Sequence, residues 1–157
     1  MREAAADEDV LAQARALLAG ERDPIANAAN LCALIFDALS EVNWAGFYFV
    51  RGRELVLGPF QGKPACVRIA YGTGVCGAAW ARRETLLVDD VHAFAGHIAC
   101  DSASNAELVV PLRAGERTVG VLDLDSPRRG RFGAVERDLL EALAALYVEA
   151  SDFGASD

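Results

Sequence analysis

A pair of apolar segments joined by a three-residue turn constrains the fold of this chain more than any other feature. Residues 107–113 and 117–123 are rich in valine and leucine, and Ala114-Gly115-Glu116 lies between them. Two such segments around a short glycine-containing link predict a β-hairpin. Because the strands of a hairpin are antiparallel neighbours, we expect the sheet that contains them to be antiparallel.

Three carboxylates gather at the open end of this predicted hairpin. Residues directly opposite each other in an antiparallel pair share a face, so a hairpin that is symmetric about Gly115 places Glu107 opposite Asp123. Asp125 follows Asp123 on the same face, since strand residues alternate. Valine residues continue this face, so the cluster borders an apolar surface. A shift of one residue would turn Glu107 to the other face, and a solvated strand end is the alternative interpretation.

An aromatic strand is predicted over residues 43–50, which read NWAGFYFV. One face of this strand is uniformly apolar and is expected to pack on helices: Ala45, Phe47 and Phe49. The other face places Gly46 between Trp44 and Tyr48, and a glycine inside a strand often marks the close approach of a ligand or of another backbone. The two rings are therefore either the wall of a pocket or ordinary core aromatics.

Amphipathic segments predict three helices packed on one face of the sheet: residues 8–19, 24–39 and 135–147. Asp23 before Pro24 has the pattern of an N-cap followed by proline at the first helical position. Cys32 falls on the apolar face of this helix, where a small buried core residue is the expected role. Irregular segments, among them the turn-rich and mobile residues 58–64, should cover the opposite face. This order of elements predicts an α+β fold.

Length and charge narrow the classes of protein further. At 157 residues the chain is expected to be one domain, residues 1–157, with disordered tails at 1–8 and 151–157. The net charge of −8 and the lack of a basic stripe argue against nucleic acid or an anionic membrane as partner. No apolar run approaches the roughly 20 residues that cross a bilayer, and residues 1–10 do not resemble a secretion signal. We expect a cytoplasmic protein.

The chain carries four cysteines, at positions 32, 66, 76 and 100. In a reducing compartment, such cysteines indicate catalysis or metal binding more often than a disulfide framework. The absence of a CxxC pair and the presence of only two histidines argue against structural zinc. Cys100 lies in the polar stretch 95–107, between His97 and Asp101, and this stretch has little that could build a core. The pattern favours a thiol redox enzyme.

Five runs of residues, in this order, resemble the free methionine-(R)-sulfoxide reductases, a family of GAF-domain enzymes: NWAGFYFV, GPFQGKPACVRI, GVCG, HIACD and GVLDLDSP. The resemblance extends from about Ile25 to Tyr147. Its most specific element is the set of three cysteines that lie ten and then twenty-four residues apart. Two features depart from the family pattern: Ala95, where proline is expected, and the basic loop from Arg128 to Arg131.

The resemblance implies a GAF-like antiparallel sheet with helices on one face and a loop-covered ligand pocket on the other. It implies thiol-dependent reduction of free L-methionine (R)-S-oxide to L-methionine, a repair of oxidative damage. By position, Cys100 would be the nucleophile, Cys66 the resolving cysteine and Cys76 a third, accessory thiol. The remaining site residues would bind the substrate: Glu107, Asp123 and Asp125 its sulfoxide and amino groups, and Trp44 and Tyr48 its side chain.

The implied cycle uses no metal and no organic cofactor. A sulfenic acid would form on Cys100 and condense with Cys66 to a disulfide, which thioredoxin would reduce. Several carboxylates in one pocket cannot all ionise, so one of them could protonate the sulfoxide oxygen at neutral pH. The resemblance also suggests a homodimer.

Other classes of function compete with this hypothesis. A non-catalytic GAF sensor would bind a small molecule without turnover and would not need its cysteines. A zinc-bound regulatory module would use Cys66, Cys76 and Cys100, with His97 as a fourth ligand. A different thiol enzyme, such as a peroxidase, would also form a sulfenic acid.

Overall fold

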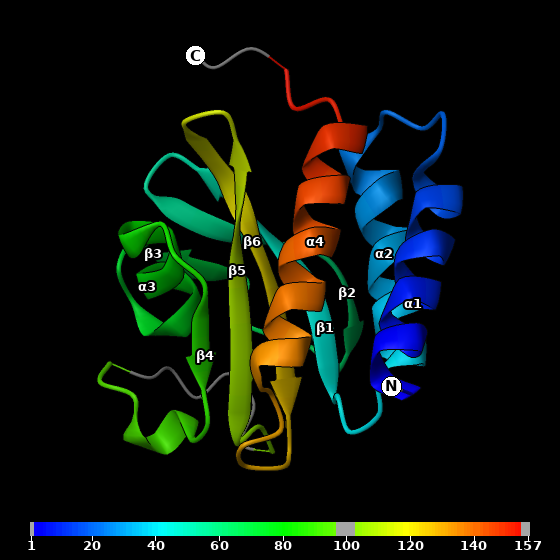
Figure 1. The fold of residues 1–157 in the computed structure, drawn as a ribbon. Helices are drawn as coiled ribbons and strands as arrows, with labels where there is room; N and C mark the ends of the chain where they lie inside the picture. Colours follow the sequence, from blue (N-terminus) through cyan, green and yellow to red (C-terminus); the bar gives the residue numbers. More distant parts are fainter. Residues whose placement is uncertain (1, 97–102, 155–157) are drawn as a thin grey trace.

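A computed structural model of the chain describes residues 2–96 and 103–154. Its elements are α1 (Arg2–Leu18), α2 (Pro24–Ala38), β1 (Trp44–Arg51), β2 (Glu54–Gly62), β3 (Arg68–Ala70), α3 (Gly74–Arg82), β4 (Leu86–Val88), the 3₁₀ helix η1 (Val91–Ala93), β5 (Ala106–Ala114), β6 (Arg117–Ser126) and α4 (Ala134–Ala150). The strands pair antiparallel in the order β3-β2-β1-β6-β5-β4. Figure 1 shows α1, α2 and α4 together beside one face of this sheet, and α3 on its other side. The predicted α+β fold is confirmed.

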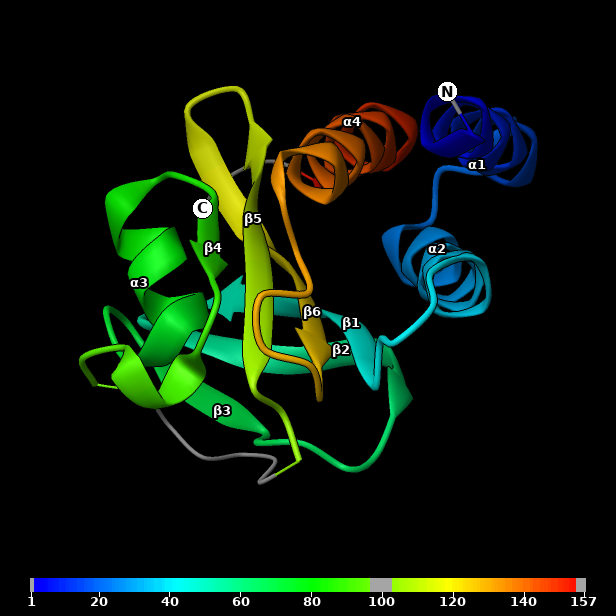
Figure 2. The same ribbon diagram turned by 60° about the horizontal axis from the view of Figure 1, so that its bottom comes forward.

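Each face of the sheet contributes to its own hydrophobic cluster. The larger cluster joins α1, α2 and α4 to strand residues such as Phe47, Leu108 and Leu122. The smaller cluster joins Trp44 and Tyr48 to residues of α3, which lies apart from the three other helices in both ribbon views (Figure 2). The predicted division of strand β1 into a helix-facing apolar side and a second, aromatic side is therefore confirmed.

The start of α2 follows the predicted capping pattern. The Asp23 carboxylate accepts hydrogen bonds from the backbone N–H groups of Ile25 and Ala26, at 2.8 and 3.0 Å. Cys32 is 1% exposed on the apolar side of this helix, and its thiol donates to the Pro59 carbonyl at 3.2 Å. The prediction of Cys32 as a core residue is confirmed, and burial raises the pKa of its thiol far above the ordinary value.

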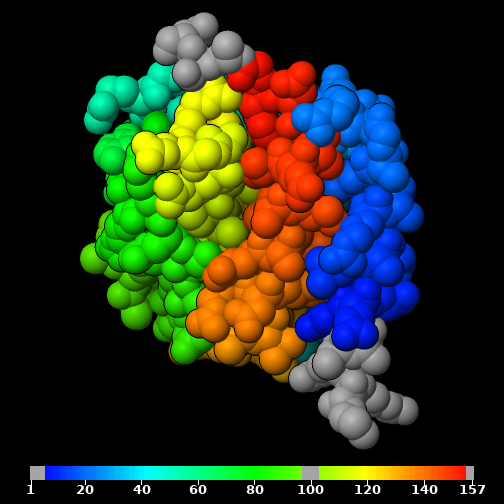
Figure 3. All heavy atoms as spheres, turned by 45° about the horizontal axis from the view of Figure 1, so that its top comes forward, coloured from blue at the N-terminus to red at the C-terminus, as the bar shows by residue number. Residues whose placement is uncertain are grey.

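Helix α1 begins at Arg2, earlier than the predicted start at residue 8. Its buried residues Val10 and Ala14 belong to the larger cluster, and α1 lies against α4 on the outside of the molecule (Figure 3). None of the helices in the described parts of the chain is both long and apolar enough to span a bilayer.

The segment after α4 is held by hydrogen bonds through Gly154, unlike the disordered tail expected from residue 151. Ser151 is buried, and its hydroxyl accepts a hydrogen bond from the Asn27 side chain at 3.1 Å. The Asp152 N–H donates to the Arg22 carbonyl at 2.8 Å. A polar tail sequence did not reveal these contacts because its partners lie on a loop and a helix far away in the sequence.

Strand β2 is longer than its sequence indicated, because it continues through the turn-rich residues to Gly62. A register shift between Gly46 and Tyr48 leaves one extra residue in β2, as in a β-bulge. A bulge tolerates Pro59, which has no N–H to donate to a ladder. The expected mobile loop is thereby shortened to the residues between Gly62 and Arg68.

The register of the β5–β6 hairpin differs by two residues from the symmetric prediction. Glu107 lies opposite Asp125, and Asp123 lies opposite Val109. The turn is centred on Gly115-Glu116, and a further irregularity between Leu112 and Arg113 adds to the offset. Because side chains alternate with a period of two, a shift of two residues leaves all three carboxylates on the same face. The predicted pairing was wrong, but the predicted cluster was not affected.

Gly120 in β6 allows β1 and β6 to pack closely. A Cβ atom at this position would overlap the Tyr48 carbonyl oxygen and would lie 3.1 Å from the Phe49 Cα. We predict that Gly120→Ala lowers the free energy of unfolding by at least about 2 kcal/mol, because the obstructing atoms are backbone. Urea unfolding measures this change.

Gly133→Ala provides the matched control. A Cβ there meets only a flexible Glu136 oxygen at 3.5 Å, so the change should cost less than about 1 kcal/mol, mainly as a poorer helix cap. Equal losses for the two variants would contradict the packing argument.

Candidate active site

Strand pairing brings the three predicted carboxylates to the face that carries α3. In the β1–β6 ladder, Asp123 lies opposite Gly46 and Asp125 opposite Trp44. The Trp44 ring lies over Gly46, where a Cβ would meet that ring at 2.5 Å. Glycine is therefore required here to leave room for the indole ring of Trp44.

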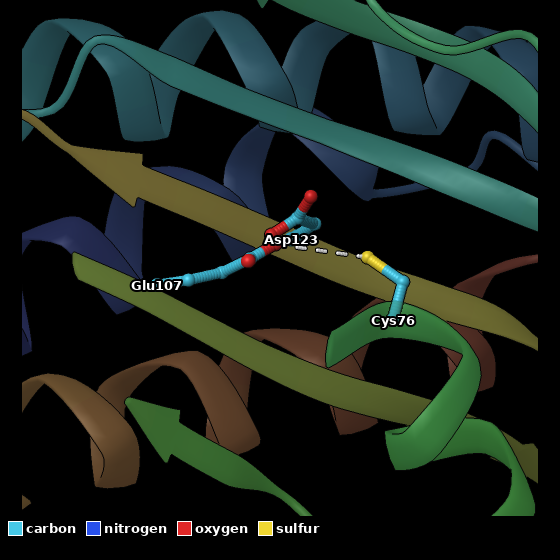
Figure 4. Close-up of side chains that lie close together, drawn as sticks. All are labelled: Cys76, Glu107 and Asp123. Carbon is cyan, nitrogen blue, oxygen red and sulfur yellow. Dashed lines mark hydrogen bonds between the residues drawn. The ribbon is translucent and has the colours of Figure 1, made fainter. Parts of the chain in front are cut away.

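Cys76 enters this cluster from the first turn of α3. Its thiol donates to Glu107 Oε2 at 3.8 Å, and one ligand atom from each of Cys76, Glu107 and Asp123 lies within 4.8 Å of the others. Figure 4 shows these side chains converging from α3, β5 and β6. These three groups are also close enough together to bind one cation. The sequence predicted a site without a metal, and this stays a prediction.

Burial makes these groups unusually weak acids. Glu107 is 9% exposed, and burial, followed by the neighbouring charge of Asp123, raises the pKa of its carboxyl well above the ordinary value. Burial and then the charge of Asp125 raise the pKa of Asp123 to about 8. A carboxyl with a raised pKa keeps its proton to higher pH, so this cluster is suited to supply a general acid, with Glu107 as the candidate.

The thiol of Cys76 is held in its protonated form by the same surroundings. Burial and the nearby charges of Asp123 and Glu107 raise its pKa well above the ordinary value. Since the thiolate is the reactive form of cysteine, Cys76 is a poor nucleophile in this structure.

One oxygen of the cluster has no protein partner. Asp123 is 5% exposed, and its buried Oδ1 makes no hydrogen bond within the described part of the chain. It borders a cavity of about 60 Å³, whose lining includes Trp44, Tyr48, Cys76, Glu107 and Asp125. A buried carboxylate oxygen is costly without a partner, so this atom is suited to bind a donor group of a ligand.

The aromatic pair has two roles in the structure. The Trp44 and Tyr48 rings stack with centroids 5.9 Å apart, and Trp44 also stacks on Phe60 at 5.3 Å. Their polar atoms, however, bind the loop after β2: Trp44 Nε1 donates to the Lys63 carbonyl, and the Tyr48 hydroxyl to the Cys66 carbonyl. The sequence left two alternatives for Trp44 and Tyr48, a pocket wall or buried core aromatics. Both are correct, because the two residues are buried and also line the cavity.

The four cysteines differ in bonding state and in whether the structure describes them. Cys66 lies on the loop before β3 and is disulfide-bonded, whereas Cys32 and Cys76 carry free thiols. Cys100, with His97 and Asp101, lies outside the described residues.

Sequence patterns missed several residues of the site. Val91 and Ser104, which flank the undescribed residues 97–102, line the cavity, as do Thr73 and Val75 at the start of α3. No periodicity marks them, because they come from loops and helix termini that only the tertiary fold brings together. The glycine-rich entry to α3 was the one local signal near Thr73 and Val75.

Comparisons with known proteins agree with this geometry. A family model described as a GAF domain matches residues 26–150. The chain is 52% identical to the free methionine-R-sulfoxide reductase of Escherichia coli (strain K12), over 83% of this chain and 79% of that protein. It superposes on the reduced fRMsr of Staphylococcus aureus with a TM-score of 0.90 and 44% identity, covering 92% and 94% of the two chains. For the free methionine-R-sulfoxide reductase from Neisseria meningitidis in complex with its substrate, the TM-score is 0.89 and the identity 44%, with 92% and 87% covered.

The raised pKa of Asp123 predicts that the protein loses stability as pH rises. Its carboxyl ionises near 3.8 when unfolded but near 8 when folded, so its stabilising contribution is full below about pH 4 and is lost as pH rises to about 8. We predict that Asp123→Asn reduces this decline and raises the free energy of unfolding at pH 8, by on the order of a few kcal/mol. Urea unfolding at several pH values measures both effects.

Asp138→Asn is the control, since Asp138 is an exposed residue that pairs with Arg137 on α4. It should leave the pH dependence of the wild-type protein unchanged. An identical decline in Asp123→Asn and wild type would show that Asp123 is ionised in the folded protein.

Proposed function

Because the chain belongs to the GAF-domain family and, within it, to the free methionine-R-sulfoxide reductases, we propose that it reduces free L-methionine (R)-S-oxide to L-methionine. The observation that carries this proposal is the buried cluster of Glu107 and Asp123, whose carboxyls have raised pKa values and border a small cavity. Reduction of a sulfoxide needs such an acid, since its oxygen leaves sulfur only after protonation.

The cavity supplies complementary groups for a free amino acid. The unpaired Oδ1 of Asp123 and the nearby Asp125 can accept hydrogen bonds from an ammonium group or from a protonated sulfoxide. The stacked rings of Trp44 and Tyr48 can pack on the thioether stem, because contacts between sulfur and aromatic rings are favourable. Partial enclosure of the substrate in this cavity would also favour a free amino acid over a methionine inside a protein chain.

The first chemical step transfers oxygen from substrate to enzyme. The thiolate of Cys100 attacks the sulfoxide sulfur and forms a sulfur–sulfur bond while Glu107 protonates the oxygen. The oxygen then passes from the methionine sulfur to the Cys100 sulfur as the sulfur–sulfur bond breaks. Methionine departs, reduced by two electrons, and Cys100 is left as a sulfenic acid.

The second step regenerates a reducible enzyme. The thiolate of Cys66 attacks the sulfenic sulfur of Cys100, the sulfur–sulfur bond forms as the sulfur–oxygen bond breaks, and the hydroxide takes a proton from solvent and leaves as water. Cys66 is favoured over Cys76 for this role because Cys66 is disulfide-bonded, whereas Cys76 is a buried thiol with a raised pKa.

Thioredoxin, a dithiol protein, would then reduce the disulfide by thiol–disulfide exchange. The cycle requires no metal or organic cofactor. It suits the cytoplasm, where thioredoxin keeps thiols reduced. A homodimer is the proposed assembly.

The direct test is turnover of the two sulfoxide epimers with a thioredoxin system. We predict release of methionine from the R epimer, little from the S epimer, and none from either epimer with Cys100→Ser. Cys66→Ser should release about one equivalent of methionine per protein and then stop. Tight binding without any turnover by the wild type would instead support the GAF sensor.

Glu107→Gln tests the acid. Glutamine keeps the size and hydrogen-bonding capacity but cannot supply the proton, so we predict that methionine release in the first turnover slows by about a hundredfold or more. Substrate binding, followed by the intrinsic fluorescence of the two tryptophans, should change far less. Rapid-quench sampling measures the rate.

Glu136→Gln is the matched control, because Glu136 caps α4 and pairs with Arg131 away from the site. It should release methionine at the wild-type rate. A wild-type rate in Glu107→Gln would assign the acid role to another group.

A further inference from the structure

The segment that carries Cys66 is a short connection between two strands. It runs from Lys63 to Val67, between the end of β2 and the start of β3. Most of its residues are exposed, and Cys66 itself is half-buried. A connection with so little buried surface depends on specific hydrogen bonds for its position.

Side chains of one strand bind two carbonyls of this segment, and the Leu57 N–H of β2 binds the carbonyl of its last residue, Val67, at 2.9 Å. Trp44 Nε1 donates to the Lys63 carbonyl at 3.1 Å, and the Tyr48 hydroxyl donates to the Cys66 carbonyl at 2.9 Å. Trp44 and Tyr48 lie on the same face of β1, and their rings are stacked. The two donors are thus fixed relative to each other by a central strand of the sheet.

The donors themselves have little freedom to move. Tyr48 is 2% exposed, and the Trp44 ring is confined by Gly46, Gly62 and Phe60, with distances of 2.5–2.7 Å to a Cβ built on either glycine. Burial, followed by the nearby charge of Asp123, raises the pKa of the Tyr48 hydroxyl. Even so, its hydrogen bond goes to the backbone of the cysteine rather than to a carboxylate.

We propose that Tyr48 and Trp44 are positioning residues for the resolving step, which hold residues 63–66 so that the Cys66 thiol meets the sulfenic acid of Cys100. This inference rests on the proposed function and adds a second role to residues that otherwise only line the substrate cavity. It separates the two chemical steps: oxygen transfer needs the rings, whereas disulfide formation needs their polar atoms.

Tyr48→Phe isolates the second role, because it keeps the ring and removes only the hydroxyl. A single hydrogen bond of this kind changes an equilibrium between held and released segments by roughly two- to tenfold. We therefore expect disulfide formation to slow by about fivefold when peroxide has formed the sulfenic acid on Cys100, a reaction that needs no substrate in the cavity. A sulfenic-acid trap such as dimedone should label more of the variant than of the wild type.

Tyr147→Phe is the matched control. Tyr147 is also fully buried, and its hydroxyl donates to a backbone carbonyl, that of Pro24, at 2.8 Å on the opposite side of the sheet. Loss of this bond should lower stability similarly but leave disulfide formation at the wild-type rate. Trp44→Phe, which removes the other donor, should slow disulfide formation as Tyr48→Phe does.

The experiment is run with methionine-R-sulfoxide and, separately, with hydrogen peroxide, which also oxidises a cysteine thiolate to a sulfenic acid. If peroxide yields the disulfide but the sulfoxide yields no methionine, the proposed substrate is wrong, and the peroxide rates still test the positioning role. Equal rates of disulfide formation in wild type, Tyr48→Phe and Trp44→Phe would overturn the inference. Equal slowing in Tyr147→Phe would also overturn it, since a general loss of stability would then explain the effect.

Discussion

The burial of Glu107 and Asp123 next to each other is the constraint on which the rest of the site depends. Burial raises the pKa of both carboxyls, and a neighbouring negative charge raises each further: that of Asp123 for Glu107 and that of Asp125 for Asp123. The same surroundings keep the Cys76 thiol protonated. An acidic, water-poor cavity is thus created by elements that in other surroundings would form only a charged strand end.

The opposite face of the sheet supplies the stability that such a cavity needs. Helices α1, α2 and α4 bury an apolar cluster against strands β1, β5 and β6, with Phe47, Leu122 and Tyr147 among its fully buried members. Because this core holds the strands in register, the second face can carry unsatisfied polar groups, including Asp123 Oδ1. One face of a single sheet therefore stabilises the fold, and the other face carries the carboxylate cluster and its cavity.

The aromatic strand β1 connects these two functions. Its apolar side packs on the helices, while Trp44 and Tyr48 both border the cavity and bind the loop of Cys66. Gly46 and Gly62 provide the space for the Trp44 ring. The wall of the cavity and the position of the Cys66 loop thus depend on the same two side chains.

The sequence by itself determined the features that repeat along the chain. Strand alternation predicted correctly which residues of β1 lie on each face of the sheet, and the Asp23-Pro24 pair predicted the start of α2. The same alternation predicted that the three carboxylates share one face. Only the tertiary structure decided the actual pairing of Glu107 with Asp125, the contact of Cys76 with Glu107, and the hydrogen bonds of Tyr48 and Trp44 to the Cys66 loop. The physical reason is that periodicity records which face a residue occupies, whereas a turn irregularity, a helix docking across a sheet and a side chain reaching a distant carbonyl leave no periodic pattern in the sequence.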